Sequence, residues 1–155
     1  MTWLPESGSG DSDLARAFAL RPELFAAWSD FAALFWRRRL VEPVVLELCR
    51  LRIASMLGAR EALAHRTPEA RDAGLTEARI ALLDAWWTSD AFGDAERACL
   101  RFAEQFALDP REIADADAAA VVAALGDAGM VAFVEALAVF DGFARFERFV
   151  AGAAS

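Results

Sequence analysis

The chain has 155 residues, a formal net charge of −8 and 57% hydrophobic residues, many of them alanine. Its length fits one compact domain, and its negative charge argues against nucleic acid or anionic membrane surfaces as partners. The alanine content favours helix. Because a domain of this size leaves part of its apolar surface uncovered, burial in an oligomer is also expected.

The first residues of the chain, 1–13, are acidic and rich in glycine and serine, and they lack the charged and apolar regions of a secretory signal. We therefore expect a flexible tail over 1–13 and a single domain over 14–155. No run of about 18 uninterrupted apolar residues exists, so no membrane span is expected. Cys49 and Cys99 stand far apart in the sequence, which favours free thiols in a reducing cytoplasm over a disulfide framework.

Helix signals follow in chain order. Pro22 stands at the start of a helix whose apolar positions recur at helical spacing. Pro43 starts a second helix, which runs to Leu57 and stops at Gly58. The stretch 60–73 predicts a third helix that ends at Gly74.

The second half continues the pattern. Thr76 is a good N-cap for a helix that carries Ile80 and Trp86. Asp94 caps the next helix, which Asp109–Pro110 ends. Two further helices are expected, separated by Gly126: 117–125 and 128–150. No segment alternates β-branched and polar residues, so the sequence predicts an all-α helical bundle of six to eight helices.

The stretch 41–80 combines an acidic residue in an apolar helix, a glycine stop, a histidine, and an Ala-Gly-Leu-Thr boundary, and it reads VEPVVLELCRLRIASMLGAREALAHRTPEARDAGLTEARI. It resembles the carboxymuconolactone decarboxylase and alkylhydroperoxidase D-like family. The flanking segments 21–24 and 84–104 extend the resemblance. The family pattern has an acid on the first helix, a Cys-x-x-Cys pair with one or two histidines, and an alanine-rich turn.

The resemblance implies a degenerate active site. Glu47 takes the place of the family's acid, and Ala59 and Ala62 take the two cysteine positions. Arg66 takes the place of the catalytic histidine, and His65 matches a neighbouring histidine found in many members. A dithiol peroxidase needs one thiolate to attack the peroxide and a second thiol to resolve the sulfenic acid. Thiol peroxidase activity is therefore not expected.

Two interpretations of Glu47 follow from its apolar helix. A buried carboxylate is costly unless it is paired, and an ion pair with Arg50 at i+3, or with another arginine of the bundle, is the interpretation we favour. The alternative is an acid or base of raised pKa in a small pocket.

His65 is the only histidine and titrates near neutrality. It is either structural, with Glu61 at i−4 as a surface partner, or an acid-base group; no metal-binding spacing accompanies it. Arg66 is suited to pair with a ligand carboxylate. The aromatic residues are expected mostly in the core.

Two functions stay open. The first is a divergent family member that binds or transforms a small anionic or carbonyl compound by acid-base chemistry, with Glu47 and His65 as catalytic residues and Arg66 as a ligand-binding residue. The second is a non-enzymatic oligomeric scaffold or partner-binding subunit. No cofactor and no metal are expected, and the family resemblance implies a homo-oligomer, a trimer or a hexamer. A preformed pocket bordered by Glu47 and His65 would favour the first function.

Overall fold

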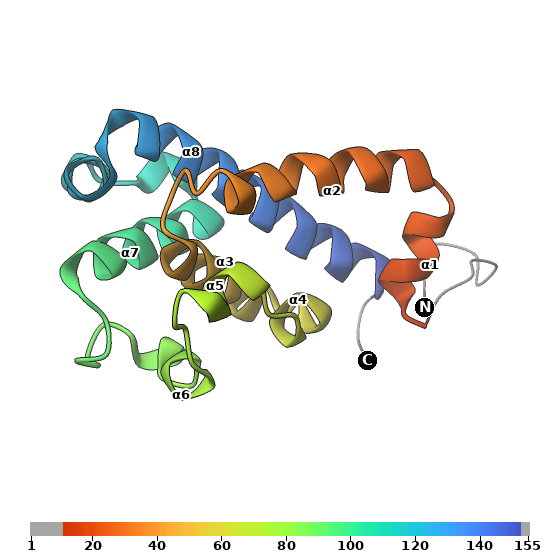
Figure 1. The fold of residues 1–155 in the computed structure, drawn as a ribbon, viewed down its shortest axis with the longest axis horizontal. Helices are drawn as coiled ribbons and strands as arrows, with labels where there is room; N and C mark the ends of the chain where they lie inside the picture. The colour runs from red at the N-terminus through yellow and green to blue at the C-terminus, as the bar shows by residue number, and fades with distance from the viewer. Residues whose placement is uncertain (1–10, 153–155) are drawn as a thin grey trace.

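The computed structural model describes residues 11–152, and every regular element in this range is helical (Figure 1). Short 3₁₀ turns lie in two of the connections between helices, at Leu83–Ala85 and Pro110–Glu112. The α-helices are α1 (Asp13–Ala19), α2 (Pro22–Arg37), α3 (Pro43–Leu57), α4 (Arg60–Ala64), α5 (Pro68–Asp72), α6 (Glu77–Ile80), α7 (Asp94–Leu108) and α8 (Asp115–Val150). The all-α prediction is confirmed.

Helix α3 lies at the centre of the bundle and packs against α7 and α8. Its apolar residues point to all sides, and its neighbours cover them on all sides, as the near-continuous apolar sequence indicated. The largest side chains that are fully buried at these contacts are Leu46, Leu48, Leu51, Ile53, Leu100, Phe133 and Leu137. Each contributes about 1.5–3 kcal/mol of transfer free energy. Gly58 ends α3 with a φ of 66°, a left-handed conformation that glycine adopts without strain.

Helix α8 bends at Gly126, where φ is 73° and ψ is 170°. The two predicted helices 117–125 and 128–150 are therefore confirmed as two arms of one element that meet at this glycine. By length and composition, α8 is also the one helix of the described residues that could cross a membrane. It packs along α3 and α7 in the bundle.

The predicted continuous helix over 60–73 is wrong. Helix α4 ends at Ala64, the backbone is extended at His65 and Thr67, and α5 starts at Pro68. A proline disfavours the helical conformation of the residue before it, so Thr67 leaves the helix. This break turns His65 and Arg66 into loop residues.

The helix expected after Thr76 is also much shorter than predicted. It breaks up after the four-residue α6, and a 3₁₀ turn follows at Leu83–Ala85. Tertiary contacts override the local preference here, because Trp86 is buried and its indole N–H donates to Glu104 on α7 (2.7 Å). In addition, Gly93 and not Asp94 is the N-cap of α7, and the Glu96 side chain accepts a hydrogen bond from the Gly93 N–H (2.9 Å).

Helices α1 and α2 pack on the arm of α8 that follows its bend (Figure 1). Helix α1 was not predicted. Ser12 is its N-cap and accepts the Ala15 N–H (3.2 Å), so residues 12 and 13 of the predicted tail belong to this helix. The rest of that prediction, residues 1–10, lies outside the described part of the chain. The start of α2 at Pro22 is confirmed.

Candidate functional site

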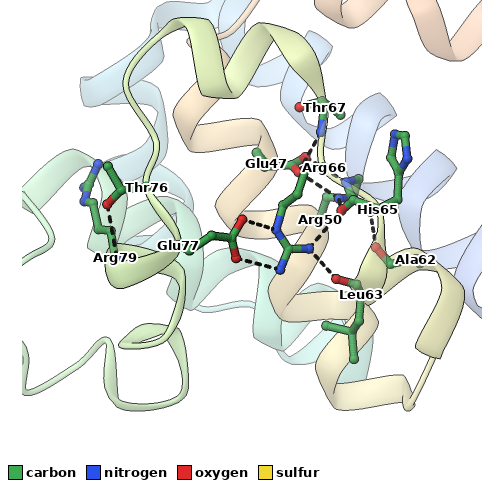
Figure 2. Close-up of polar contacts among 10 residues, drawn as sticks. All are labelled: Glu47, Arg50, Ala62, Leu63, His65, Arg66, Thr67, Thr76, Glu77 and Arg79. Atoms are coloured by element: carbon green, nitrogen blue, oxygen red, sulfur yellow. Dashed lines mark hydrogen bonds and ion pairs between the residues drawn. The ribbon is translucent and has the colours of Figure 1, made fainter.

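Glu47 lies on α3 and is completely buried. Its carboxylate forms a two-pronged ion pair with Arg50, in which Nε donates to Oε2 and Nη2 donates to Oε1, both at 2.8 Å. A third hydrogen bond comes from the backbone N–H of Thr67 to Oε1 (3.1 Å). This is the i, i+3 ion pair that the sequence favoured for Glu47. The carboxylate therefore joins α3 to the start of α5 (Figure 2).

Arg50 continues from Glu47 toward the loop after α4. Its Nη1 donates to the carbonyl of Ala62 (2.7 Å), and its Nη2 donates to the carbonyl of His65 (2.8 Å). A guanidinium has five N–H groups. Four are used in these contacts and in the pair with Glu47, which leaves one Nη1 hydrogen without a partner among residues 11–152. Arg50 thus fixes the 62–67 backbone and keeps one donor available.

His65 follows the last turn of α4, and Figure 2 shows its imidazole pointing away from the Arg50 cluster. The ring makes no hydrogen bond to any other residue of the described chain. Partial burial of the ring, which is otherwise exposed, and the nearby Arg50 guanidinium lower the pKa of His65 below its ordinary value of 6.5. The imidazole is therefore neutral at physiological pH, the form that can accept a proton. The predicted surface partner, Glu61, instead accepts a hydrogen bond from Ser12 (2.8 Å).

Arg66 is held on the opposite side of the same loop (Figure 2). Its Nε and Nη2 donate to the two carboxylate oxygens of Glu77, at 2.8 and 3.1 Å, and its Nη1 donates to the carbonyls of Leu63 and His65. The loop thus brings Glu47 and His65 close to Arg50, whereas the Arg66 guanidinium is directed toward α6. Its predicted role as a ligand-binding residue stays a prediction.

Ala59 and Ala62, which the resemblance aligns with the family's two cysteines, lie at the N-terminus of α4. Ala59 is completely buried and Ala62 is 7% exposed. A second buried acid, Glu147 of α8, accepts hydrogen bonds from the backbone N–H groups of Glu61 (2.8 Å) and Ala62 (3.0 Å). A carboxylate therefore occupies the helix end whose N–H groups would otherwise favour a thiolate. Sequence reasoning missed Glu147, because it lies 86 positions beyond Glu61.

A cavity of about 470 Å³ opens beside α4, between α1, α2, α3 and α8. This volume is within the range of small-molecule sites, roughly 300–1,000 Å³. Aromatic side chains make up much of its wall: Phe18, Phe25, Trp28, Trp36, Phe140 and Phe143. Its polar lining residues gather from α3, α4 and the neighbouring loops: Ser12, Arg50, Glu61, His65 and Thr67. Glu47 and Arg66 are not among the lining residues.

Sequence reasoning assigned these aromatic residues mostly to the core. The sequence carried one signal for the cavity, since the segments of α2 and α8 that contain Trp28 and Phe143 repeat aromatic residues at helical spacing. In the structure both of these side chains are partly exposed. Thr67 was also missed. It is 6% exposed, and its buried Oγ1 has no hydrogen-bond partner among the residues that the structure describes.

Both thiols are buried outside this cavity. Burial raises the pKa of Cys49 well above its ordinary value, and it raises the pKa of Cys99 to about 12. Within residues 11–152, no group of three His, Cys, Asp or Glu side chains is placed to hold a metal ion. The polar groups that line the cavity are the imidazole of His65, the guanidinium of Arg50, the carboxylate of Glu61 and the hydroxyls of Ser12 and Thr67.

Comparison with known proteins agrees with this architecture. The sequence model of the carboxymuconolactone decarboxylase family matches residues 22–105, more than half of the chain. A crystal structure of a protein of unknown function from Agrobacterium tumefaciens, a candidate antioxidant defence protein of the AhpD type, superposes with a TM-score of 0.73. It is 22% identical, over 84% of this chain and 89% of that chain, a likeness that concerns the fold. No curated protein sequence matches. The chain belongs to the carboxymuconolactone decarboxylase family.

Proposed function

We propose that this protein is a family member without thiol peroxidase activity, and that it binds a small carbonyl or anionic compound in the cavity and transforms it by acid-base chemistry. The observation that carries the proposal is the polar end of the cavity. There, the neutral imidazole of His65 and an arginine with a free donor both line the cavity, while Ala59 and Ala62 stand where the resemblance places the family's cysteines.

His65 would act as the acid-base group. A neutral imidazole can take a proton from a carbon next to a carbonyl group, forming an enolate and an imidazolium. The remaining Nη1 hydrogen of Arg50 would stabilise the negative oxygen of the enolate. The imidazolium then returns a proton to the substrate. Glu47 contributes as a positioning residue, because its bonds to Arg50 orient the guanidinium.

Hydrogen–deuterium exchange tests this chemistry directly. A ketone incubated with the protein in D₂O should exchange its α-hydrogens faster than without protein, as measured by NMR. Replacement His65→Gln should abolish the gain, while Asp72→Asn, at an exposed position of α5 outside the cavity, should preserve it. Exchange that persists in His65→Gln would remove the histidine from the mechanism.

A hydroperoxide assay tests the other half of the proposal. With a dithiol reductant present, turnover should not exceed the protein-free rate, since neither buried thiol lies in the cavity. Turnover that Cys49→Ser or Cys99→Ser abolishes would contradict it.

The alternative function, an oligomeric scaffold, has an observation of its own. A second apolar hollow lies between α2 and α8, lined by Phe31, Leu34, Phe35, Leu40, Ala128, Val131, Ala132 and Glu135. Val131 is 66% exposed and Leu40 is 50% exposed, and contiguous exposed apolar surface of this kind marks sites of protein–protein contact. We propose that a second copy of the chain covers it in a homo-oligomer. Light scattering at micromolar concentration tests this, and it can hold together with the acid-base function.

A further inference from the structure

The cavity selects for an apolar ligand body. Aromatic faces from three helices meet in it: the rings of Trp28 and Phe143 are 4.5 Å apart and nearly parallel, and those of Phe18 and Phe25 are 4.3 Å apart. Phe18 also lies 6.0 Å from Phe143. Such surfaces favour flat aromatic or other apolar groups, because these groups leave water and gain stacking contacts.

The charges at the polar end do not suit an anion. Arg50 is the cation on the cavity wall, and its charge is already balanced by the two-pronged pair with Glu47. Glu61 adds a negative charge to the wall. It is exposed, and Ser12 is the one described residue whose hydrogen bond to its carboxylate is seen (2.8 Å). A ligand carboxylate entering here would lose its hydration and find no unpaired positive charge. Burying such a charge without a partner is costly.

A neutral acceptor fits better. One Nη1 hydrogen of Arg50 is available, and a carbonyl oxygen needs a single good donor to satisfy it. The ligand body would then extend along Trp28 and Phe143, which line the same cavity as Arg50. We infer that the cavity takes a neutral, largely aromatic or apolar molecule that carries one carbonyl group, in preference to a carboxylate of the same shape. This inference rests on the proposed function and narrows its ligand class.

Matched ligand pairs test the inference. Aromatic methyl ketones on naphthalene, biphenyl and indane scaffolds are compared with the carboxylates of the same scaffolds, with calorimetry giving Kd at pH 7.5. We expect each ketone that binds to bind at least tenfold more tightly than its carboxylate. Carboxylates that bind as tightly as the ketones, or more tightly, would overturn the inference while leaving the cavity and the proposed function in place.

Replacing either of two neighbouring alanines by phenylalanine tests whether the ketone binds in the cavity. Ala32 lines the cavity, and its neighbour Ala33 has a similar half-buried position on α2 but does not line it. Replacement Ala32→Phe should abolish ketone binding, and Ala33→Phe should retain it. Binding that survives Ala32→Phe lies elsewhere and overturns the inference. Failure of every ketone and every carboxylate to bind the native protein would overturn both the inference and the proposed function.

A third variant tests the role of charge. Glu61→Gln removes the negative charge from the wall and keeps the side-chain shape. The carboxylate should bind several-fold more tightly, so the ratio of the carboxylate Kd to the ketone Kd should fall. If the ratio of the two Kd values does not change, the charge of Glu61 does not cause the preference for ketones over carboxylates, which would overturn the argument for a neutral ligand.

Discussion

The buried ion pair between Glu47 and Arg50 offers the sharpest test of how the site is built. The replacement Glu47→Gln keeps the side-chain shape, removes the negative charge and places an amide N–H₂ where an oxygen accepted from the guanidinium. Arg50 is only 11% exposed in its side chain, so its charge would stay buried without compensation. Breaking a buried pair in this way costs about 3–5 kcal/mol.

The expected loss can be stated as a melting shift. In a domain of this size, each kcal/mol lowers the midpoint by roughly 2–4 °C, so Glu47→Gln should melt about 6–20 °C below the native protein. The matched control is Glu23→Gln, because Glu23 pairs with Arg21 on the surface, where both side chains are more than half exposed. An exposed pair contributes roughly 0–1 kcal/mol. Calorimetry and urea unfolding measure both variants.

A double replacement separates the lost pair from lost packing. In Glu47→Gln/Arg50→Met, the stranded cation is gone, so the double variant should be more stable than the sum of the two single losses predicts. If Glu47→Gln loses no more stability than Glu23→Gln, the pair is not structural. Glu47 would then be an acid kept in the site at the expense of stability, as the second interpretation of the sequence holds.

Three further outcomes follow from the structure. Burial and Arg50 lower the pKa of His65 in the folded protein, so the fold favours the neutral ring. The folded protein is therefore fully stable with respect to this group above the unfolded pKa of about 6.5, and it loses stability as the pH falls from there through the folded pKa. The single Hε1 signal of His65 should therefore titrate below 6.5, and His65→Gln should be less sensitive to acid in this window; a midpoint at or above 6.5 would contradict this. Cys49 and Cys99 should react with Ellman's reagent at pH 8 only after unfolding in urea, because burial raises the pKa of both; rapid reaction of native protein would mean that a thiol is accessible. Val131→Arg in the hollow between α2 and α8 should shift an oligomer toward monomer in light scattering, whereas Glu112→Arg, exposed and outside that hollow, should not; equal effects would argue against this surface.

Features that depend on neighbouring residues could be predicted from the sequence. Pro43 and Gly58 limit the backbone locally, so the bounds of α3 were predictable, and so was the bend at Gly126. Glu47 and Arg50 are three positions apart on one helix, so their ion pair follows from helix geometry. The break at Thr67 also had a local signal in Pro68, which the alanine-rich pattern of 60–73 outweighed in the prediction.

Features made by distant segments could not be predicted. The cavity needs α1 and α2 to lie over α8, and α1 has only seven residues, too few for a clear periodic signal. The direction of Arg66 toward Glu77 depends on the loop that the break creates. For this reason Arg66, which the family resemblance aligns with the catalytic histidine, is paired with Glu77 and does not line the cavity.

The contact between Glu147 and α4 leads to a last prediction, which concerns why restoring the cysteine pair should not restore its chemistry. In Ala59→Cys/Ala62→Cys, both thiols would lie at the helix end whose N–H groups at Glu61 and Ala62 already bind the Glu147 carboxylate. A like charge nearby disfavours a thiolate, and the N–H groups that would lower a thiol pKa are occupied.

We expect alkylation of the introduced cysteines to show a pKa at or above the ordinary thiol value of about 8.5. Adding Glu147→Gln removes the competing charge, so it should lower that pKa and speed alkylation at pH 7. Peptide-resolved mass spectrometry follows each site, and circular dichroism checks that the helices persist, since Glu147 is buried and its loss also weakens the α4 end. If the double variant already carries a thiol of strongly lowered pKa, the carboxylate does not control this helix end. In that case the two alanines alone would separate this protein from dithiol chemistry.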